Sequence, residues 1–488
     1  MKIPLDRQSQ QPIYLQIRDR ISHLITAGAL QPGMQLPSIR MLAETVQVNK
    51  LTVIEAYNVL EADGLIHARQ GAGYFVNTGT RLTPRLDPSF APSQTVVIQE
   101  QPGTTFSELY LASVRALHQQ DWLDLSCGFP NPPVDLRQVS RRAISDVAET
   151  LFNYDLPQGQ ATLRKQIALM LIQQGLELSP DDLIITNGSK QALSLAMHYY
   201  LKPGDWVVVE SPSYHGGLAI LSHLGVRVIG IPMTHEGMNL DLLEQYLKSH
   251  RPRLIYTIST LHNPTGVTSS LAHRQRLVAL AHQYECPILE DNAYEGLSFE
   301  PAPPPIKAID QYGWVTYIGT FSKTLMPGLR VGYMVPAKPH YSALLEQKLL
   351  HDLHASTVSQ AIVSEYLASG HYRRHLNALR STHLHSRNVM LQAMEQHFPE
   401  GMEWTVPQGG LFLWVKLPQT LPLQALYQDL AAQRLLVGNG AAFFPGRSAY
   451  PAMRLSFIRS PEEIERGIAI LGQRLKHHLM ASSSPVLS

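Results

Sequence analysis

The sequence predicts a multidomain protein in which a winged helix-turn-helix precedes an α/β unit with a mostly parallel sheet. Three observations predict this. Residues 1–78 repeat their apolar side chains at helical spacing, residues 79–120 break that rhythm, and residues 121–488 alternate strand-like and helical runs. From about residue 340 long helices mix with a few strands, which indicates a smaller α/β part at 340–488.

Three helices are predicted in residues 1–78. Ser38 is expected to cap the second helix, and Asn49 the third, which runs from Lys50 to about Asp63, because both side chains accept hydrogen bonds from helix N-termini. The first helix should end at Gly28. Its apolar residues recur at helical spacing: Ile13, Ile17, Ile21, Leu24 and Ile25.

A hairpin should complete this unit. The runs LIHAR and GYFV flank Gln70-Gly71-Ala72-Gly73, a glycine-rich turn. Three helices followed by a hairpin is the order of a winged helix-turn-helix. The alternative is a small helical domain that mediates protein contacts.

Residues 79–120 are predicted to be a linker, partly extended, because they are rich in proline and keep no lasting period. The stretch FSELYLASVRALHQQ at the end of this segment is a candidate short helix.

Short β-branched runs predict the strands of the α/β unit. Several are apolar throughout, as expected for strands that are buried on both faces of a parallel sheet. Helical segments such as QALSLAMHYYL lie between them, which is typical of an α/β fold. The strand-like runs are residues 183–186, 206–210, 226–231, 253–258, 287–290 and 315–319.

Composition narrows the class of protein. Lys+Arg minus Asp+Glu is 40 − 39 = +1, which excludes a strongly polybasic nucleic-acid binder and an acidic disordered chain. Two cysteines, Cys127 and Cys286, cannot build a disulfide framework and suit a reducing compartment. The N-terminus has no apolar signal segment, and no apolar run approaches the roughly 20 residues that span a bilayer. We therefore expect a soluble, cytoplasmic protein.

The stretch GTFSKTLMPGLRVGY (319–333) carries the strongest chemical signal. Lys323 follows a strand, lies among small hydroxylated residues and precedes Arg330. A lysine that forms a Schiff base must lose its proton, and burial beside a cation would lower its pKa. A surface lysine after a strand is the alternative.

Four other segments lie just after predicted strands, where ligands bind in open α/β sheets. The turn Thr186–Lys190 leads into a helix whose N-terminus suits a phosphate, although an ordinary turn would look the same. Asn263 opens NPTG, and Asp291 and Tyr294 lie in LEDNAY. A buried carboxylate at Asp291 would need a cation such as a protonated pyridine nitrogen. Tyr214, in SPSYHGG, offers a ring for stacking.

Together these motifs resemble the fold-type-I, class I/II aminotransferases that use pyridoxal 5'-phosphate, over residues 121–488. The resemblance implies that Lys323 binds this cofactor as a Schiff base and that Asp291 pairs with its ring nitrogen. Asn263 and Tyr294 would bond the ring hydroxyl, and Tyr214 would stack on the ring. The residues implied for the phosphate are Gly188, Ser189, Lys190, Thr320, Ser322 and Arg330, with Tyr154 reaching the phosphate of a neighbouring subunit.

The same resemblance implies a substrate site. Arg454, in AMRLSF, resembles the arginine that clamps a substrate carboxylate in a bidentate pair, and Gly128 resembles the glycine that faces the substrate. Lys190 stands where many relatives carry glutamine. No clear match exists to the second arginine of dicarboxylate-specific enzymes.

No metal site is predicted. The pairs His351/His354 and His383/His385 lie among basic helical residues without a carboxylate cluster, so solvated helix faces are expected rather than metal ligands.

Residues 11–76 resemble a GntR-type winged helix, through the runs LPSIRMLA, TVIEAYNVLEADGLI and RQGAGYFV. The resemblance implies that the Asn49–Glu55 helix enters the major groove of double-stranded operator DNA, with the wing at the minor groove. Residues 1–80 hold seven Lys/Arg and six Asp/Glu, so charge alone argues little for DNA. The residues implied in DNA contacts are Ser38, Arg40, Asn49, Lys50 and Thr52 from the helices, and Arg69, Gln70 and Gly71 from the wing.

Both parts in this order resemble the MocR subgroup of GntR regulators. The first hypothesis is therefore a homodimeric transcriptional regulator whose aminotransferase-like domain senses pyridoxal phosphate or an amino compound. The runner-up is a working aminotransferase that acts on an amino acid and a 2-oxo acid. A scaffold without cofactor is the third reading and would leave Lys323 idle.

Overall fold

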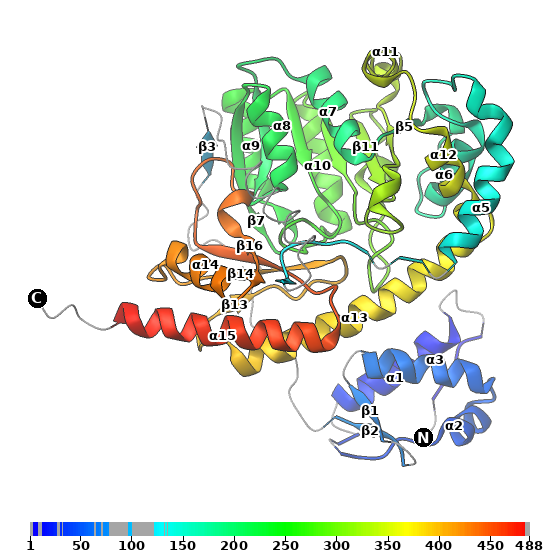
Figure 1. Cartoon of the computed structure of the whole chain (residues 1–488), viewed down its shortest axis with the longest axis vertical. Helices are drawn as coiled ribbons and strands as arrows, with labels where there is room; N and C mark the ends of the chain where they lie inside the picture. The colour runs from blue at the N-terminus through cyan, green and yellow to red at the C-terminus, as the bar shows by residue number, and fades with distance from the viewer. Residues whose placement is uncertain are drawn as a thin grey trace, which may run out of the picture.

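The computed structural model shows two bodies, a small N-terminal unit and a larger unit that carries the C-terminus (Figure 1). Among the helices that are described, none is long and apolar enough to cross a bilayer. The structure describes residues 3–7, 12–26, 30–31, 33–62, 65–69, 72–77, 96–99, 122–130, 132–133 and 135–483.

The N-terminal unit has the predicted order of three helices and a hairpin. Its elements are α1 (Ile13–Thr26), α2 (Ile39–Val46), α3 (Lys50–Ala62), β1 (Ile66–Arg69) and β2 (Gly73–Val76). Helices α1 and α2 both pack on α3, and β1 pairs antiparallel with β2. The core is buried apolar residues at helical spacing, among them Ile17, Ile21, Val53, Tyr57 and Leu60.

Local capping explains the helix-turn-helix. The Ser38 hydroxyl accepts a hydrogen bond from the Met41 N–H at 3.2 Å, which starts α2 as predicted. Gln47 ends α2 in the left-handed conformation, with φ of 55°. The Asn49 Oδ1 then accepts from the Leu51 N–H at 3.0 Å at the start of α3. The chain therefore turns within a few residues between α2 and α3.

A large sheet forms the centre of the other unit. Its order is β3-β7-β6-β9-β10-β11-β12-β5, with β8 paired to β7. The five strands from β7 to β11 are parallel to their neighbours, whereas β3 and β12 are antiparallel. The strands are β3 (Val97–Gln99), β5 (Ile184–Thr186), β6 (Trp206–Ser211), β7 (Arg227–Thr234), β8 (Gly237–Met238), β9 (Leu254–Thr257), β10 (Ile288–Asp291), β11 (Val315–Thr320) and β12 (Gly332–Val335).

Helices cover both faces of this sheet, because alternate residues of one strand belong to different cores. Val207 and Val209 pack with α7, α8 and α11, while Val208 packs with α9 and α10. Both faces are therefore buried, which accounts for the continuous apolar runs of the sequence. The helices of this unit are α5 (Leu136–Val147), α6 (Ala161–Ile172), α7 (Ser189–Tyr200), α8 (His215–His223), α9 (Leu240–His250), α10 (Leu271–Gln283), α11 (Tyr341–Asp352) and α12 (Thr357–Ala368).

A smaller sheet with three helices follows. Its order is β13-β14-β17-β16, antiparallel throughout, and α13 and α15 lie side by side beneath it (Figure 1). A short parallel pair, β4 with β15, adjoins it. The elements are β4 (Leu123–Asp124), α13 (His371–His397), β13 (Glu403–Trp404), β14 (Phe412–Lys416), α14 (Leu423–Ala432), β15 (Leu435–Leu436), β16 (Gly438–Asn439), β17 (Ala452–Ser456) and α15 (Pro461–Ser483).

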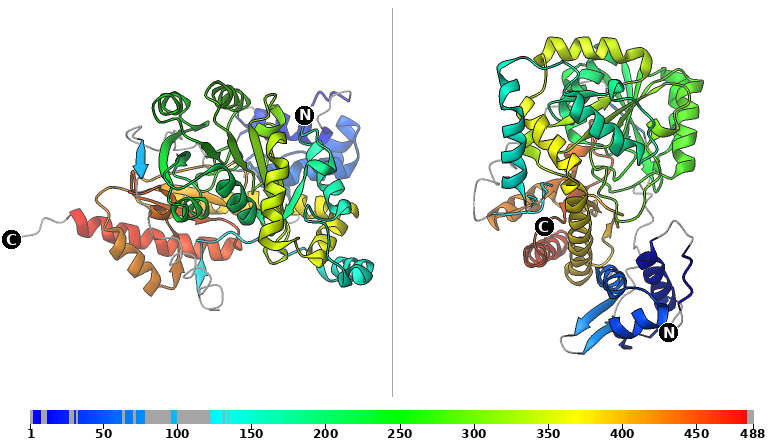
Figure 2. Two further views of the ribbon diagram at one scale, coloured as in Figure 1. Left: turned by 90° about the horizontal axis from the view of Figure 1, so that it is seen from above. Right: turned by 90° about the vertical axis from the view of Figure 1, so that its right-hand side faces the viewer.

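Helix α13 belongs to two cores at once. Tyr372 and Leu376, near its start, pack in the core around the large sheet, and Met390 and Met394, near its end, pack under the smaller sheet. It also contacts α3 of the N-terminal unit, and two views show it between the two bodies (Figures 1 and 2). One helix thus joins all three parts of the chain.

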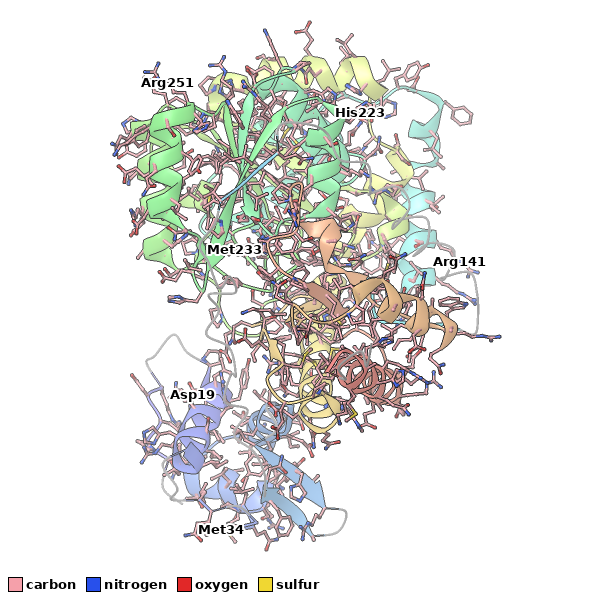
Figure 3. The ribbon with its side chains drawn as sticks, turned by 90° about the vertical axis from the view of Figure 1, so that its left-hand side faces the viewer. Asp19, Met34, Arg141, His223, Met233 and Arg251 are labelled. Carbon is pink, nitrogen blue, oxygen red and sulfur yellow. The ribbon has the colours of Figure 1, made fainter. Side chains whose placement is uncertain are left out.

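The two bodies also meet through an ion pair. Arg18 of α1 donates from Nη1 and Nη2 to the two carboxylate oxygens of Glu300, at 2.9 and 3.2 Å. Figure 3 labels Asp19, the next residue along α1, on the side of the N-terminal unit nearer the larger one, and Met34 on the far side. The pair is bidentate, the geometry in which an arginine–carboxylate contact is most specific.

The segment 79–120 was predicted to be a partly extended linker, and its described residues are 96–99. Val97–Gln99 forms β3, which pairs with β7 and extends the large sheet at its edge. Valine and isoleucine favour a strand once an open sheet edge is available, which a local reading cannot foresee. The candidate helix at 106–120 and the turn residues Gln70 and Gly71 lie outside the described residues.

Candidate functional site

A cavity of about 570 Å³ opens where the parallel strands end and the smaller sheet packs over them. Most residues predicted for the site line it, although they come from distant parts of the chain. Those predicted residues are Gly128, Ser189, Lys190, Tyr214, Asn263, Asp291, Tyr294, Thr320, Ser322, Lys323, Arg330 and Arg454.

Lys323 stands three residues after β11. Its Nζ donates to the Gly128 carbonyl at 3.0 Å and lies inside the protein, while part of the side chain opens to the cavity. Burial lowers the pKa of Lys323 to about 8, with further lowering by the charges of Arg454 and Arg330. A larger share of the Lys323 side chain is then neutral at pH 7 than at the usual pKa near 10.4. A nucleophilic amine is available near neutral pH.

Asp291 ends β10 with its carboxylate buried. Its Oδ2 accepts from the Tyr256 hydroxyl at 3.0 Å, but Oδ1 is buried and has no hydrogen bond of normal geometry among the described residues. Burial raises the pKa of Asp291 to about 6. Asp291 also interacts with the Ala293 backbone N–H, but a buried carboxylate held by neutral donors is costly unless a cation meets it. The protonated ring nitrogen of pyridoxal phosphate fits this requirement.

Asn263 links the cavity floor to the smaller sheet. Its Nδ2 donates to the Tyr294 hydroxyl at 2.9 Å, and its Oδ1 accepts from Arg454 Nη1 at 2.9 Å. Arg454 Nη2 donates to the Ser126 carbonyl at 2.5 Å, whereas Nε is buried without a partner among the described residues. The guanidinium lies 3.8 Å from the ring centroid of Phe412. Arg454 is therefore a fixed cation whose hydrogen-bonding capacity is not filled.

A second cationic group lies at the N-terminus of α7. Lys190 begins this helix beside Arg330, and burial, then the charge of Arg330, lowers the pKa of Lys190. Arg330 Nη1 donates to the Ser322 hydroxyl at 3.2 Å, and the Thr320 hydroxyl donates to Ser322 at 3.1 Å. Two cations, hydroxyl groups and helix N–H groups meet here, as an anion such as a phosphate requires.

Two glycines are required by close approaches. Gly188 has φ of +76°, and a Cβ there would lie 2.3 Å from Arg330 Nη2. Gly188 thus adjoins this anion-binding group at the start of α7 but is not among the residues that line the cavity. A Cβ on Gly128 would meet the Phe412 ring at 2.6 Å. Gly128 was expected to face the substrate, and its position in the lining of the cavity is compatible with that expectation. The close packing against Phe412 would by itself require a glycine at this position.

Tyr154 is the predicted site residue that lies away from the cavity. Its side chain is 84% exposed, and its ring contacts the His354 ring edge-on at 6.0 Å. The prediction for Tyr154 concerned a neighbouring subunit, so a position on the surface is compatible with it.

Several residues of the site were not foreseen. Tyr256 lies in a run that looked like a buried strand, so nothing marked its hydroxyl as the partner of Asp291. His215 follows Tyr214 and lines the cavity, and burial lowers its pKa well below the usual value, which keeps the ring neutral. Cys127 also lines the cavity.

The residues predicted to bind DNA lie on α2, α3 and the wing. Arg40 is exposed and pairs with Glu44 at 3.0 Å, one helical turn away. Asn49 and Lys50 are exposed at the start of α3, and Thr52 is half-buried. Arg69 is exposed on the wing, with its guanidinium 4.7 Å from the Phe75 ring centroid. Ser38 is occupied as a helix cap, while Gln70 and Gly71 are outside the described residues.

One histidine departs from expectation. His383 was predicted on a solvated helix face, but it is buried on α13, and burial lowers its pKa to about 4. The polarity of its neighbours misled the prediction, because the inner face of a helix is set by tertiary packing. Among the described residues, no group of three or more His, Cys, Asp and Glu could hold a metal ion.

Comparison with known proteins agrees with this geometry. Residues 120–471 match the family described as aminotransferase class I and II, and residues 13–76 match the bacterial regulatory proteins of the gntR family. The chain is 32% identical to the HTH-type transcriptional regulator YdfD of Bacillus subtilis, over 98% of this chain and 99% of that protein. It is 35% identical to aromatic-amino-acid aminotransferase 1 of Thermococcus litoralis, over 75% of this chain and 91% of that protein.

Solved structures give the same fold. The multiple substrate aminotransferase of Thermococcus profundus matches with a TM-score of 0.72 and 32% identity, over 78% of this chain and 96% of that chain. LysN of Thermus thermophilus, an α-aminoadipate aminotransferase solved with N-(5'-phosphopyridoxyl)-L-leucine, matches with a TM-score of 0.70 and 30% identity, over 77% and 98%.

Fold and cavity thus define a fold-type-I aminotransferase domain behind a winged helix-turn-helix. The chain belongs to the class I and II aminotransferase family, in the MocR-like branch whose members carry a gntR-type DNA-binding domain in front. It is a GntR-like regulator fused to an aminotransferase domain.

Proposed function

We propose that this regulator binds operator DNA through residues 1–78 and senses pyridoxal 5'-phosphate, or an amino compound through it, with residues 121–488. Residues 79–120 connect the two. The observation that carries the proposal is the cavity, in which an amine of lowered pKa, a carboxylate oxygen without a normal hydrogen bond and a buried guanidinium converge. The test is an absorbance spectrum with and without amino acids, followed by a gel shift on the upstream DNA.

Each part of the cavity has a role in holding the cofactor. Pyridoxal phosphate, when bound, withdraws electrons from the α-carbon of an amino compound. Lys323 provides the amine that bonds its aldehyde, and Asp291 accepts from its ring nitrogen. Asn263 and Tyr294 hold its hydroxyl, and Tyr214 stacks on the ring. Its phosphate is bound by the group at the start of α7: Gly188, Ser189, Lys190, Thr320, Ser322 and Arg330.

Arg454 is assigned to the carboxylate of the amino compound. Its planar donor group matches a carboxylate, and Arg454 is among the residues that line the cavity. The rings of Phe412 and Phe443, with centroids 3.8 and 4.7 Å from the guanidinium carbon, hold the group in place. Gly128, whose carbonyl accepts from Lys323, lines the same cavity.

DNA binding is assigned to the exposed start of α3, and Lys50→Ala tests it. Because lysine neutralises a phosphate as a point charge, this variant should bind operator DNA more weakly and lower the salt slope by about one unit. Fluorescence anisotropy at several salt concentrations measures both. Lys165→Ala removes the same charge from exposed α6 and should change neither. Unchanged affinity and slope in Lys50→Ala would exclude this contact.

We propose a symmetric dimer that shares its sites through Tyr154. Leu350 and Phe152 are 80% and 90% exposed, and the contact between Tyr154 and His354 places their two segments together. Such an apolar surface suits an interface between copies.

A Leu350→Glu variant tests the dimer. Placing like charges near a two-fold interface should shift a dimer toward monomer at micromolar concentration, as measured by light scattering. Met480→Glu adds the same charge at an exposed position of α15 and should remain dimeric. A monomeric wild-type protein would contradict the shared site.

A working aminotransferase is the second candidate. It is favoured by Arg454, because a carboxylate clamp matters most where an amino acid must be oriented for removal of the proton at its α-carbon. Lys323, once the amino compound has displaced it from the cofactor, would be the amine that takes that proton. Transfer of an amino group to a 2-oxo acid, lost in Arg454→Ala, would support this candidate.

A further inference from the structure

The loop that leads into α7 is tied to the end of α11. Asp352 Oδ2 accepts from Asn187 Nδ2 at 2.5 Å and from Gln191 Nε2 at 2.8 Å. Gln191 Oε1 in turn accepts from the Asn187 backbone N–H at 2.8 Å. These three hydrogen bonds enclose residues 188–190, the part of the loop that is assigned to the phosphate.

Asp352 is itself held by a buried cation. Lys348 lies one helical turn earlier on α11, is fully buried and pairs with Asp352 Oδ1. Each carboxylate oxygen therefore has its own partners: Oδ1 the lysine, and Oδ2 the two amides. A carboxylate fixed in this way is a rigid acceptor, because its rotation would leave a buried ammonium without a counter-charge.

The effect of Asp352 continues to Arg330. The Asn187 carbonyl accepts from Arg330 Nη2 at 3.2 Å, and Arg330 Nη1 donates to the Ser322 hydroxyl at 3.2 Å. Asp352 thus fixes the orientation of Asn187, and the Asn187 carbonyl in turn fixes the position of the Arg330 guanidinium. Gly188 lies against that same guanidinium and leaves no room for a shift of the loop toward it.

We propose that Asp352 is a positioning residue for the phosphate of the cofactor. It fixes the Asn187–Gln191 loop and, through Asn187, the orientation of Arg330, without touching the cofactor itself. This inference rests on the proposed binding of pyridoxal phosphate. It assigns to Asp352 the phosphate end of the ligand and leaves the ring end to Asp291 and Lys323.

The test compares two ligands that differ only in the phosphate. Pyridoxal 5'-phosphate and pyridoxal are titrated, by absorbance, onto the wild-type chain, Asp352→Asn and Gln191→Leu. Both variants are expected to lower the affinity for pyridoxal phosphate on the order of 10-fold, the usual effect of losing a charge-assisted hydrogen bond. Their affinity for pyridoxal should stay the same. Glu346→Gln removes an exposed carboxylate from the same helix and should leave both affinities unchanged.

The ratio of the two affinities decides the outcome. A general loosening of the fold would weaken both ligands together and would overturn the positioning role, as would variants that keep the wild-type ratio. Asp352→Asn could leave Lys348 unpaired and prevent folding; Gln191→Leu keeps that ion pair and then decides alone. If the wild-type chain binds neither ligand, the proposed function is wrong. If the wild-type chain prefers pyridoxal phosphate and both variants keep that preference, only the positioning role of Asp352 is wrong.

Discussion

A Lys323→Ala variant is expected to lose the covalent cofactor adduct completely. The wild-type protein should be yellow with pyridoxal phosphate, and borohydride should trap the cofactor on one lysine. The reason is the lowered pKa of Lys323, about 8, which supplies a neutral amine beside Asp291 and Arg454. Mass spectrometry of the reduced protein identifies the modified residue.

Lys190→Ala is the matched control for this experiment. It removes the other lysine that lines the cavity but leaves Lys323 in place. The adduct should therefore still form, with weaker binding because one charge near the phosphate is gone. An adduct that survives in Lys323→Ala, or disappears only in Lys190→Ala, would show that the reactive amine is elsewhere.

Operator affinity is expected to differ between the apo protein and the protein with an adduct at Lys323, by a factor of about 5–150, the usual range of coupling between sites. Few residues separate the proposed cofactor site from the contact with the winged helix. Asp291 and Tyr294 are the residues proposed to hold the cofactor, and nine residues after Asp291 the same segment reaches Glu300, which binds Arg18 of the winged helix. Arg380 of α13 binds the carbonyl of Gly296 within that segment at 2.6 Å.

Glu300→Gln should reduce this factor toward one. The variant removes the charge that holds Arg18 but adds none to the DNA-binding face, whereas replacing Arg18 would alter both. Fluorescence titrations of operator DNA onto apo, cofactor-loaded and amine-treated protein, at one salt concentration, give the factor. Glu400→Gln removes an exposed carboxylate elsewhere and should preserve it. By reciprocity, operator DNA must change the affinity for the ligand by the same factor.

Equal dissociation constants in all three states of the wild-type protein would mean that the two bodies are merely tethered. A ligand that binds every arrangement equally cannot shift their populations. The aminotransferase alternative would then be the better account of the large domain.

Much of the fold follows from local sequence patterns. Runs such as WVVVE and VTYIG became strands β6 and β11 with ends within a residue of the prediction, because strands buried on both faces carry an unbroken apolar signal. The caps Ser38 and Asn49 act locally and were predictable for the same reason. The edge strand β3 was not, since its pairing with β7 depends on a partner more than 100 residues away.

The residues of the site also fall into two groups, those that a local motif predicts and those that it does not. Asp291 ends a strand, and Lys323 and Asn263 follow the ends of two others, each within a recognisable motif. Parallel strands bring their carboxyl ends to one edge. Tyr256 and Asp352 carry no such motif. Their importance comes from hydrogen bonds to residues 35 and 165 positions away, and nothing in their own neighbourhood predicts these partners.

Because α13 packs in both cores, it connects the smaller sheet to the core around the large sheet. Met394 is fixed under the smaller sheet, and Arg380 lies 14 residues earlier on the same helix, roughly 21 Å away at 1.5 Å per residue. Because Tyr372 and Leu376 hold the start of α13 in the core around the large sheet, the helix cannot tilt about its Met394 end without disturbing that core. Any ligand-dependent shift of the smaller sheet would therefore reach, along α13, the bond between Arg380 and the Gly296 carbonyl.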